Sequence, residues 1–225
     1  MITVGIIGAM YSEIELLTNK MINLKEQELA GLTIYSGILN RKKVVICQSG
    51  IGKSAAAAAT QLLCSVFNVD VIINTGIAGN LSNNLKIGDV ILSKKVMYHD
   101  IDADLILKNN MRFDYFNGNP LLLLLTSQIC EQLNIKYIPG TIISGDKFIN
   151  NKSEKERLRE EYNADCVEME GAAIAHIASK NNIPFIVIRT LSDDADENSQ
   201  SIDISQFCET SSNIVLELLK LINEI

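Results

Sequence analysis

The chain has 225 residues, of which 47% are hydrophobic and 21% charged, and its formal net charge is -7 at pH 7. This size and composition predict one compact globular domain, residues 1–225, and exclude a linker-rich or disordered chain. The 20 Lys and Arg residues are dispersed, so we expect no nucleic-acid partner.

We expect neither an export signal nor a membrane-spanning segment. The first ten residues do not resemble a signal peptide, and no apolar stretch approaches the roughly 20 residues that span a bilayer. The five cysteines are widely spaced and mostly within apolar segments, which predicts reduced core thiols in a cytoplasmic protein with no membrane partner. With two histidines and no cysteine pair at metal-ligand spacing, we expect neither a metal nor a cofactor.

Apolar runs bounded by Gly, Asn or Asp predict buried strands. Most runs are continuous instead of alternating, which is typical of strands that are covered on both faces. The predicted strands are residues 3–7, 44–47, 71–74, 89–93, 141–143 and 185–191.

Segments with helical periodicity lie between these runs, at residues 12–20, 53–66, 120–133, 153–162, 171–180 and 204–225. The alternation predicts an α/β fold, a three-layer α/β/α sandwich with a central mixed, largely parallel sheet. Residues 104–119 have no clear period and predict a long surface loop. In such sheets ligands bind at the carboxyl ends of strands, so the residues just after each run are the informative ones.

The first strand is followed by a loop that contains Glu13. Ser12 can cap the next helix, which would place Glu13 in its first turn, beside the positive end of the helix dipole. The position favours an ionised carboxylate. Glu13 could simply compensate the charge of the helix dipole, or it could be a functional acid.

The second strand leads into a glycine-rich junction that opens a helix, where backbone amides could hold an anion or a ribose. A phosphate-binding P-loop would need glycine at position 47, which is Cys47. A dinucleotide fingerprint that uses Gly50 and Gly52 would need an acid ending the next strand, but Asp70 precedes that strand. Neither motif is therefore predicted.

The third junction contains Gly76 and Gly79. Two glycines allow the backbone to approach a flat ligand closely, and they also suit a tight turn with positive φ. The motif alone leaves both interpretations open.

Two later junctions are rich in acids. Glu168 and Glu170 flank Met169 at a helix entry, where acids can be caps or can accept hydrogen bonds from a sugar diol. The last strand contains Arg189 and ends at Asp193. A buried arginine demands a partner, so an ordered polar site is expected there, with Asp193 acting on a ligand.

Together these motifs resemble the 5'-methylthioadenosine/S-adenosylhomocysteine nucleosidases of the nucleoside phosphorylase/hydrolase superfamily. The resemblance covers nearly the whole chain, in order. It implies a nucleoside phosphorylase-like fold, a nucleoside substrate and a homodimer. The matching segments are Gly5–Met10 with Glu13, Ser49–Lys53, Ile73–Gly76 with Ala78–Gly79, Tyr98–Asp100, Ser144–Asp146 with Phe148–Asn150, Val167–Glu170, and Arg189 with Ser192–Asp193.

The resemblance also implies roles for individual residues. Glu13 matches the acid that activates water, Asp193 the acid that protonates adenine N7, and Glu170 the carboxylate that holds the ribose hydroxyls. The other implied contacts are Met169 against the ribose, Phe148 stacked on adenine, the Ile149 backbone at the base, Met10, Ile51 and Phe207 around the 5'-alkylthio group, and Ser192, Arg189, Ala78 and Gly79 supporting the site.

Glycosidic cleavage passes through an oxocarbenium-like state that needs an acid at the leaving group and a base at the water. A phosphorylase of the same superfamily would need cationic residues near the nucleophile, and residues 8–13 contain none. A hydrolase is therefore favoured over a phosphorylase. The presence of Glu13, Glu170 and Asp193 favours it over a non-catalytic nucleoside-binding protein.

The chain departs from the family pattern at two places. Ile77 stands where the family commonly has serine, and residues 100–108 lack the family's aromatic, glycine-rich and proline-containing stretch. The 5'-substituent and the dimer contact are the properties these departures affect.

Overall fold

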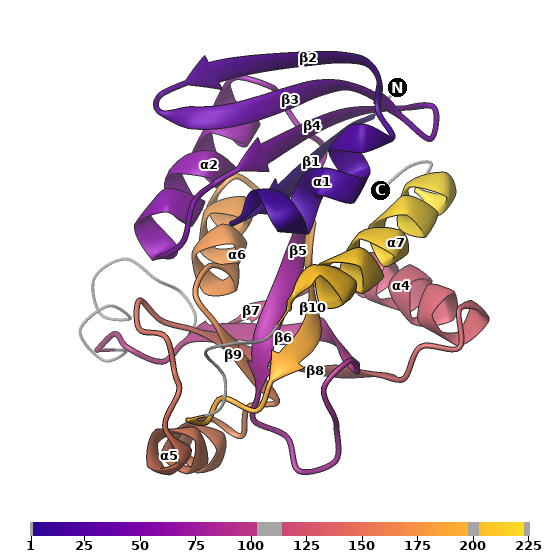
Figure 1. The fold of residues 1–225 in the computed structure, drawn as a ribbon. Coiled ribbons are helices and arrows are strands. Elements are labelled where there is room, and N and C mark those ends of the chain that lie inside the picture. Colours follow the sequence, from indigo (N-terminus) through magenta and orange to yellow (C-terminus); the bar gives the residue numbers. More distant parts are fainter. Residues whose placement is uncertain (1, 103–113, 198–202, 223–225) are drawn as a thin grey trace.

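The computed structural model, which describes residues 2–102, 114–197 and 203–222, is an α/β fold around a ten-stranded mixed sheet (Figure 1). The strands are β1 (Thr3–Gly8), β2 (Ile22–Leu29), β3 (Leu32–Leu39), β4 (Lys42–Gln48), β5 (Val71–Asn80), β6 (Val90–Tyr98), β7 (Phe116–Asn117), β8 (Tyr137–Ser144), β9 (Cys166–Glu168) and β10 (Phe185–Asp193). The helices are α1 (Tyr11–Asn19), α2 (Lys53–Ser65), α4 (Pro120–Gln132), α5 (Lys152–Tyr162), α6 (Gly171–Lys180) and α7 (Ser205–Leu221).

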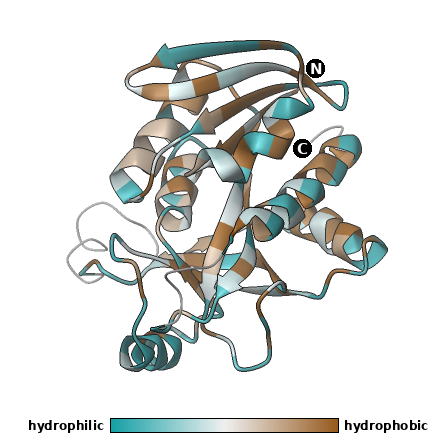
Figure 2. Ribbon diagram, in the orientation of Figure 1, coloured by the Kyte–Doolittle hydropathy of each residue, from teal (hydrophilic) through white to brown (hydrophobic). Residues whose placement is uncertain are grey.

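The central strands are apolar on both faces, as the continuous runs predict. Ile6 and Ile7 are adjacent in β1 and fully buried, yet they belong to different core clusters, because successive side chains of a strand point to opposite faces. The cluster around Ile7 includes residues of α2 and α6, and that around Ile6 includes residues of α1, α4 and α7. Figure 2 shows the brown, hydrophobic strands between these helices.

The sheet is partly closed. β5 pairs with β1 and with β10, and at its carboxyl end it also pairs with β9, so β5, β10, β6, β8 and β9 form a ring of paired strands. The described strands make five parallel and five antiparallel pairs. The predicted α/β class and mixed sheet are confirmed. A largely parallel sheet in a simple open sandwich does not describe the whole structure, because half of the described strand pairs are antiparallel and the sheet is partly closed.

The predicted helices agree with the observed ones to within a few residues at each end. The last begins at Ser205 instead of residue 204 and ends at Leu221; residues 223–225 lie outside the described part of the chain. Among the helices that the structure describes, none has both the length and the apolar character to cross a bilayer.

The ranges predicted for strands do not include β2, β3, β7 or β9. All eight residues of β2 are exposed, and its sequence, INLKEQEL, offers no apolar run of the kind that identified the other strands. The stretch predicted as a long loop, 104–119, lies partly outside the described residues, and its described end contains β7 and Asn119, which caps α4 through hydrogen bonds to the amides of Leu121 and Leu122.

All five cysteines are buried and have free thiols, as predicted for core residues. Burial raises the pKa of Cys47 to about 12, and burial together with the nearby Glu131 raises that of Cys130 to about 12. Thiols with such high pKa values form little thiolate and are poor nucleophiles.

Candidate active site

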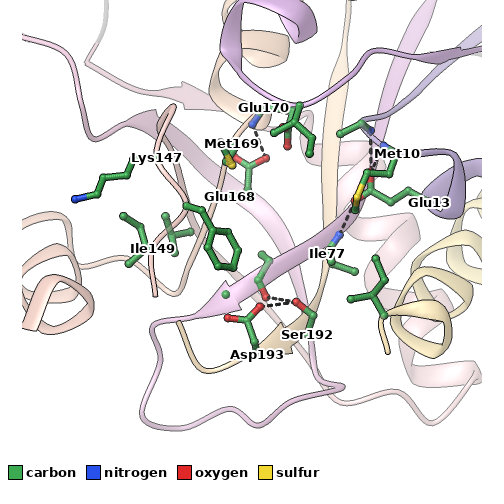
Figure 3. A pocket seen from close by; sticks show the side chains of 17 residues that line it. Met10, Glu13, Ile77, Lys147, Ile149, Glu168, Met169, Glu170, Ser192 and Asp193 are labelled. Carbon is green, nitrogen blue, oxygen red and sulfur yellow. Dashed lines mark hydrogen bonds between the residues drawn. The ribbon is translucent and has the colours of Figure 1, made fainter. Parts of the chain in front are cut away.

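A cavity of about 250 Å³ opens where the ends of several strands meet. Its walls come from segments that are far apart in the sequence (Figure 3). The lining residues are Ala9, Met10, Glu13, Ile51, Ile77, Ala78, Gly79, Lys147, Phe148, Ile149, Val167, Glu168, Met169, Glu170, Ser192, Asp193 and Ile204.

The structure brings together most of the residues that the sequence singled out. The residues that line the cavity are Met10, Glu13, Ile51, Ala78, Gly79, Phe148, Ile149, Met169, Glu170, Ser192 and Asp193. Arg189 and Phe207 do not line it. Arg189 is buried, with 2% of its surface exposed, and Phe207 is a half-buried residue in the first turn of α7, where Ile204 lines the cavity instead.

Glu13 is held by backbone amides from two loops. Its Oε2 accepts hydrogen bonds from the N–H groups of Ala9 (2.7 Å) and Met10 (3.0 Å), and its Oε1 accepts one from Ile77 (3.1 Å). Burial raises the pKa of Glu13, and although the Arg189 charge and the three amides lower it, the net direction is upward. A carboxylate with a raised pKa is a stronger base, suited to taking a proton from water.

The prediction that Ser12 caps α1 is wrong. The helix begins at Tyr11, and its N-cap residue is Met10, two residues before Ser12. Glu13 is the third residue of the helix and therefore lies in its first turn, as predicted. From that position the Glu13 side chain reaches back to the Met10 N–H, as in a capping box. The capping interaction is thus made by Glu13 itself.

Gly76 and Gly79 are not turn residues. β5 continues to Asn80, and neither glycine has a positive φ, so the turn interpretation is wrong. A Cβ at Gly76 would overlap Glu13 Oε1 and lie 3.2 Å from Arg189 Nη1. The glycine therefore makes room for a carboxylate and a guanidinium beside the strand.

Arg189 forms an ion pair with Glu168. Their atoms Nη2 and Oε2 are 2.5 Å apart, and only 2% of either side chain is exposed. Glu168 also accepts hydrogen bonds from the amides of Glu170 (3.0 Å) and Gly171 (2.7 Å) and from the Ser144 hydroxyl. The sequence indicated that Arg189 needs a buried partner, and Glu168 is that partner.

Glu170 lies at the start of α6, on the opposite wall of the cavity from Asp193 (Figure 3). Its Oε1 accepts a hydrogen bond from the Gly52 N–H at 2.8 Å, which links it to the beginning of α2. Burial, and then the negative charge of Glu168, raise the pKa of Glu170 to about 8. A raised pKa favours the protonated form, in which a carboxyl group can donate a hydrogen bond as well as accept one.

Asp193 ends β10 and is buried, with 6% of its surface exposed. Its Oδ2 accepts a hydrogen bond from the Ser192 hydroxyl at 2.7 Å, and its Oδ1 accepts one from the Ala195 N–H at 2.8 Å. These contacts fix the direction in which the carboxyl group faces the cavity (Figure 3).

The sequence did not identify Glu168, Lys147, Val167, Ala9 or Ile204 as lining residues. Of these residues, only Glu168 could have been found from the sequence. It is an acid in the same junction as Met169 and Glu170, and the buried arginine needed an acidic partner. Apolar residues such as Val167 look like core residues until the tertiary structure shows that they border an opening.

Comparisons with known proteins agree on one family. The family model described as "Phosphorylase superfamily" matches residues 3–222. A protein of Staphylococcus aureus strain JH9, a 5'-methylthioadenosine/S-adenosylhomocysteine nucleosidase, is 41% identical over 200 residues, covering 84% of this chain and 86% of the relative.

Solved structures are similar over the full length. The Neisseria meningitidis 5'-methylthioadenosine/S-adenosylhomocysteine nucleosidase in complex with methylthio-immucillin-A is 33% identical with a TM-score of 0.91, covering 99% of this chain and 100% of that one. The native futalosine hydrolase of Helicobacter pylori strain 26695 is 28% identical with a TM-score of 0.90, covering 98% of each chain.

We predict that Arg189→Met lowers the free energy of unfolding by about 3–5 kcal/mol, because it leaves the buried Glu168 carboxylate without its cation. Arg157→Met is the matched control, because Arg157 pairs with Glu154 on the surface, where ion pairs contribute about 0–1 kcal/mol. Urea unfolding measures both. Equal losses in the two variants would contradict the buried ion pair.

The raised pKa of Glu170 predicts a pH dependence of stability. Between the ordinary value of 4.5 and about 8, the folded state retains a proton that the unfolded state has released. The retained proton stabilises the folded state, and this stabilisation is fully present below pH 4.5. As pH rises from 4.5 to about 8 it is lost, and the free energy of unfolding falls by up to about 1.4 kcal/mol per pH unit.

Urea unfolding across that pH range, compared with Glu170→Gln, measures the contribution. In Glu170→Gln the free energy of unfolding should fall less steeply with pH than in the wild type. The control Glu28→Gln, which changes an exposed residue, should keep the wild-type dependence on pH. A Glu170→Gln variant with the wild-type slope would show that another group binds the proton.

Proposed function

Because the chain belongs to the phosphorylase superfamily and, within it, to the 5'-methylthioadenosine/S-adenosylhomocysteine nucleosidases, we propose that it hydrolyses the N-glycosidic bond of these two nucleosides, releasing adenine and a 5-thio-substituted ribose. The observation that supports this proposal most directly is that Glu13, from the first turn of α1, and Asp193, from the end of β10, line the same cavity. Hydrolysis needs a base and an acid on separate sides of the bond.

In this proposal Glu13 activates the water. Both oxygens of its carboxylate accept hydrogen bonds from backbone amides, so no other side chain is needed to hold the carboxylate in place. Its raised pKa strengthens it as the base that removes a proton from water as the glycosidic bond breaks.

Asp193 protonates N7 of the leaving adenine. The proton neutralises the charge that develops on the purine as electrons of the glycosidic bond move onto the ring. Ser192 and the Ala195 amide support the role, because their hydrogen bonds hold the carboxyl group toward the cavity.

Glu170 holds the ribose hydroxyls, with Met169 against the sugar. The two residues lie together on one wall, where Glu170 is fixed by Gly52. Phe148 stacks on adenine and the Ile149 backbone contacts the base. Met10 and Ile51, with Phe207 or the nearer Ile204, surround the 5'-alkylthio group, which is apolar like these side chains.

The charges around Glu13 favour water over phosphate as the nucleophile. Within the described part of the chain, Lys147 is the basic residue that lines the cavity, and it lies with Ile149 on the wall away from Glu13 (Figure 3). The Arg189 guanidinium is already paired with Glu168. A phosphate ion beside Glu13 would meet a carboxylate and no free cation.

We also propose a cytoplasmic homodimer, as the family resemblance implies. Five buried, unpaired thiols support a reducing compartment. Light scattering on the purified protein should give twice the chain mass of 24.8 kDa. A mass of one chain at micromolar concentration would contradict the dimer.

The activity is tested by adenine release from methylthioadenosine in phosphate-free buffer. We expect wild-type turnover, and a rate lower by at least about 10²-fold in both Glu13→Gln and Asp193→Asn, because each loses a proton-transfer group. Matched controls are Glu15→Gln and Asp194→Asn, since both acids are exposed neighbours that do not line the cavity.

Undiminished rates in Glu13→Gln and Asp193→Asn would overturn these roles. Consumption of phosphate with formation of a sugar 1-phosphate would identify a phosphorylase instead. Repeating the assay with 5'-substituted adenosines, S-adenosylhomocysteine and 5'-deoxyadenosine among them, ranks the substrates.

A further inference from the structure

Three charged residues outside the cavity join the loops that form its walls. Lys53 Nζ lies 2.5 Å from Asp100 Oδ1 and 3.5 Å from Asp146 Oδ2. The second Asp100 oxygen accepts a hydrogen bond from the Asp146 N–H at 2.8 Å, and the second Asp146 oxygen accepts one from the Lys53 N–H at 2.8 Å. We refer to Lys53, Asp100 and Asp146 as the loop-joining cluster.

The cluster supplies a cap that α2 does not contain. The N-cap residue of α2 is Gly52, which has no side chain to accept the unpaired amides at the helix start. Two carboxyl groups from elsewhere accept hydrogen bonds from these amides: Asp146 of the cluster accepts from Lys53, and Glu170, outside the cluster, accepts from Gly52. Negative charge at this end of a helix is favourable. With φ of +101°, Gly52 adopts a conformation that suits glycine.

Both loops joined here contribute exposed residues to the cavity. Ile51 immediately precedes the α2 cap, and Phe148 follows Asp146 by two residues. Ile51 is 60% exposed and Phe148 50% exposed, so neither is fixed by core packing. The contacts at Lys53 and Asp146 therefore hold the backbone that presents these two side chains.

Within the cluster, the pair of Lys53 and Asp100 is more buried than an ordinary surface ion pair, which adds little to stability. The Lys53 side chain is 16% exposed and that of Asp100 is 27% exposed. Burial raises the pKa of Asp100, but the hydrogen bonds from Lys53 and from the Asp146 amide outweigh it, and the net direction is downward. Asp100 therefore stays ionised in the range where the enzyme would work.

We propose that Lys53, Asp100 and Asp146 are positioning residues that hold the loop of Phe148 against the loop of Ile51, and so set the affinity of the cavity for its ligand. The inference rests on the proposed function for the identity of that ligand. Glu13 and Asp193 make no contact with the loop-joining cluster among the hydrogen bonds of the described residues, so the cluster acts on binding more than on bond cleavage.

The test compares Lys53→Met with Lys136→Met. Lys136 also forms an ion pair, with Asp89 at 2.9 Å, but it does not line the cavity. We expect Lys53→Met to raise KM for methylthioadenosine, and the Kd for adenine measured by calorimetry, by about tenfold or more, because hydrogen bonds to charged groups are lost. Its kcat should stay within about threefold of wild type, and Lys136→Met should match wild type.

Two further variants separate positioning from general destabilisation. Lys53→Arg keeps the charge and should restore most of the affinity. Asp100→Asn should weaken adenine binding, and the double variant Lys53→Met/Asp100→Asn should be no weaker than Lys53→Met alone, because both changes break the same contact. If urea unfolding shows that Lys53→Met is not cooperatively folded, Asp100→Asn replaces it in the test, with the same expected changes in KM, adenine Kd and kcat.

Unchanged KM and adenine Kd in Lys53→Met, or a fall in kcat alone, would overturn the proposal. So would additive effects of Lys53→Met and Asp100→Asn. A wild-type protein that binds adenine but releases none from any nucleoside would refute the proposed function, while the adenine affinities of the variants would still decide the role of the cluster.

Discussion

The cavity depends on one buried guanidinium. Arg189 is almost fully buried in β10, and it is the cation whose charge stabilises the buried acids Glu168, Glu13 and Glu170. A buried carboxylate without a partner would lose several kcal/mol of solvation. The geometry around the guanidinium follows from this constraint: Glu168 pairs with it directly, and Gly76 leaves the space that the Glu13 carboxylate and the guanidinium share.

Backbone amides complete the charge balance, because one arginine cannot satisfy three acids. Glu13 accepts three amide hydrogen bonds, Glu168 accepts two, and Glu170 accepts one from the start of α2. Amides in fixed secondary structure need no reorganisation during a reaction, which makes them effective in an active site. The environments of the three acids therefore differ: Glu168 pairs directly with the cation, whereas burial raises the pKa of Glu13 and of Glu170.

Local sequence predicted much of this arrangement. Helical periodicity identified α2 and α6 with accurate starts. Apolar runs identified β1, which precedes the helix that carries Glu13, and β10, which ends at Asp193. These signals are local because each helix and buried strand has a characteristic hydrophobic period. The resemblance of the junctions to one family then indicated adenine nucleoside hydrolysis, and the comparisons confirmed the family.

Only the tertiary structure decided how the strands pair and which groups meet. The exposed strand β2 has no apolar run, and the pairing of β5 with β9 joins Gly79 to Val167 and Asn80 to Cys166, which are far apart in the sequence, so neither left a local pattern. The same holds for the pairing of Arg189 with Glu168 and for the capping of α2 by Asp146. The sequence alone determined which residues stand at the strand ends, while the fold decided their partners, because charge pairing depends on distance in space and not on separation along the chain.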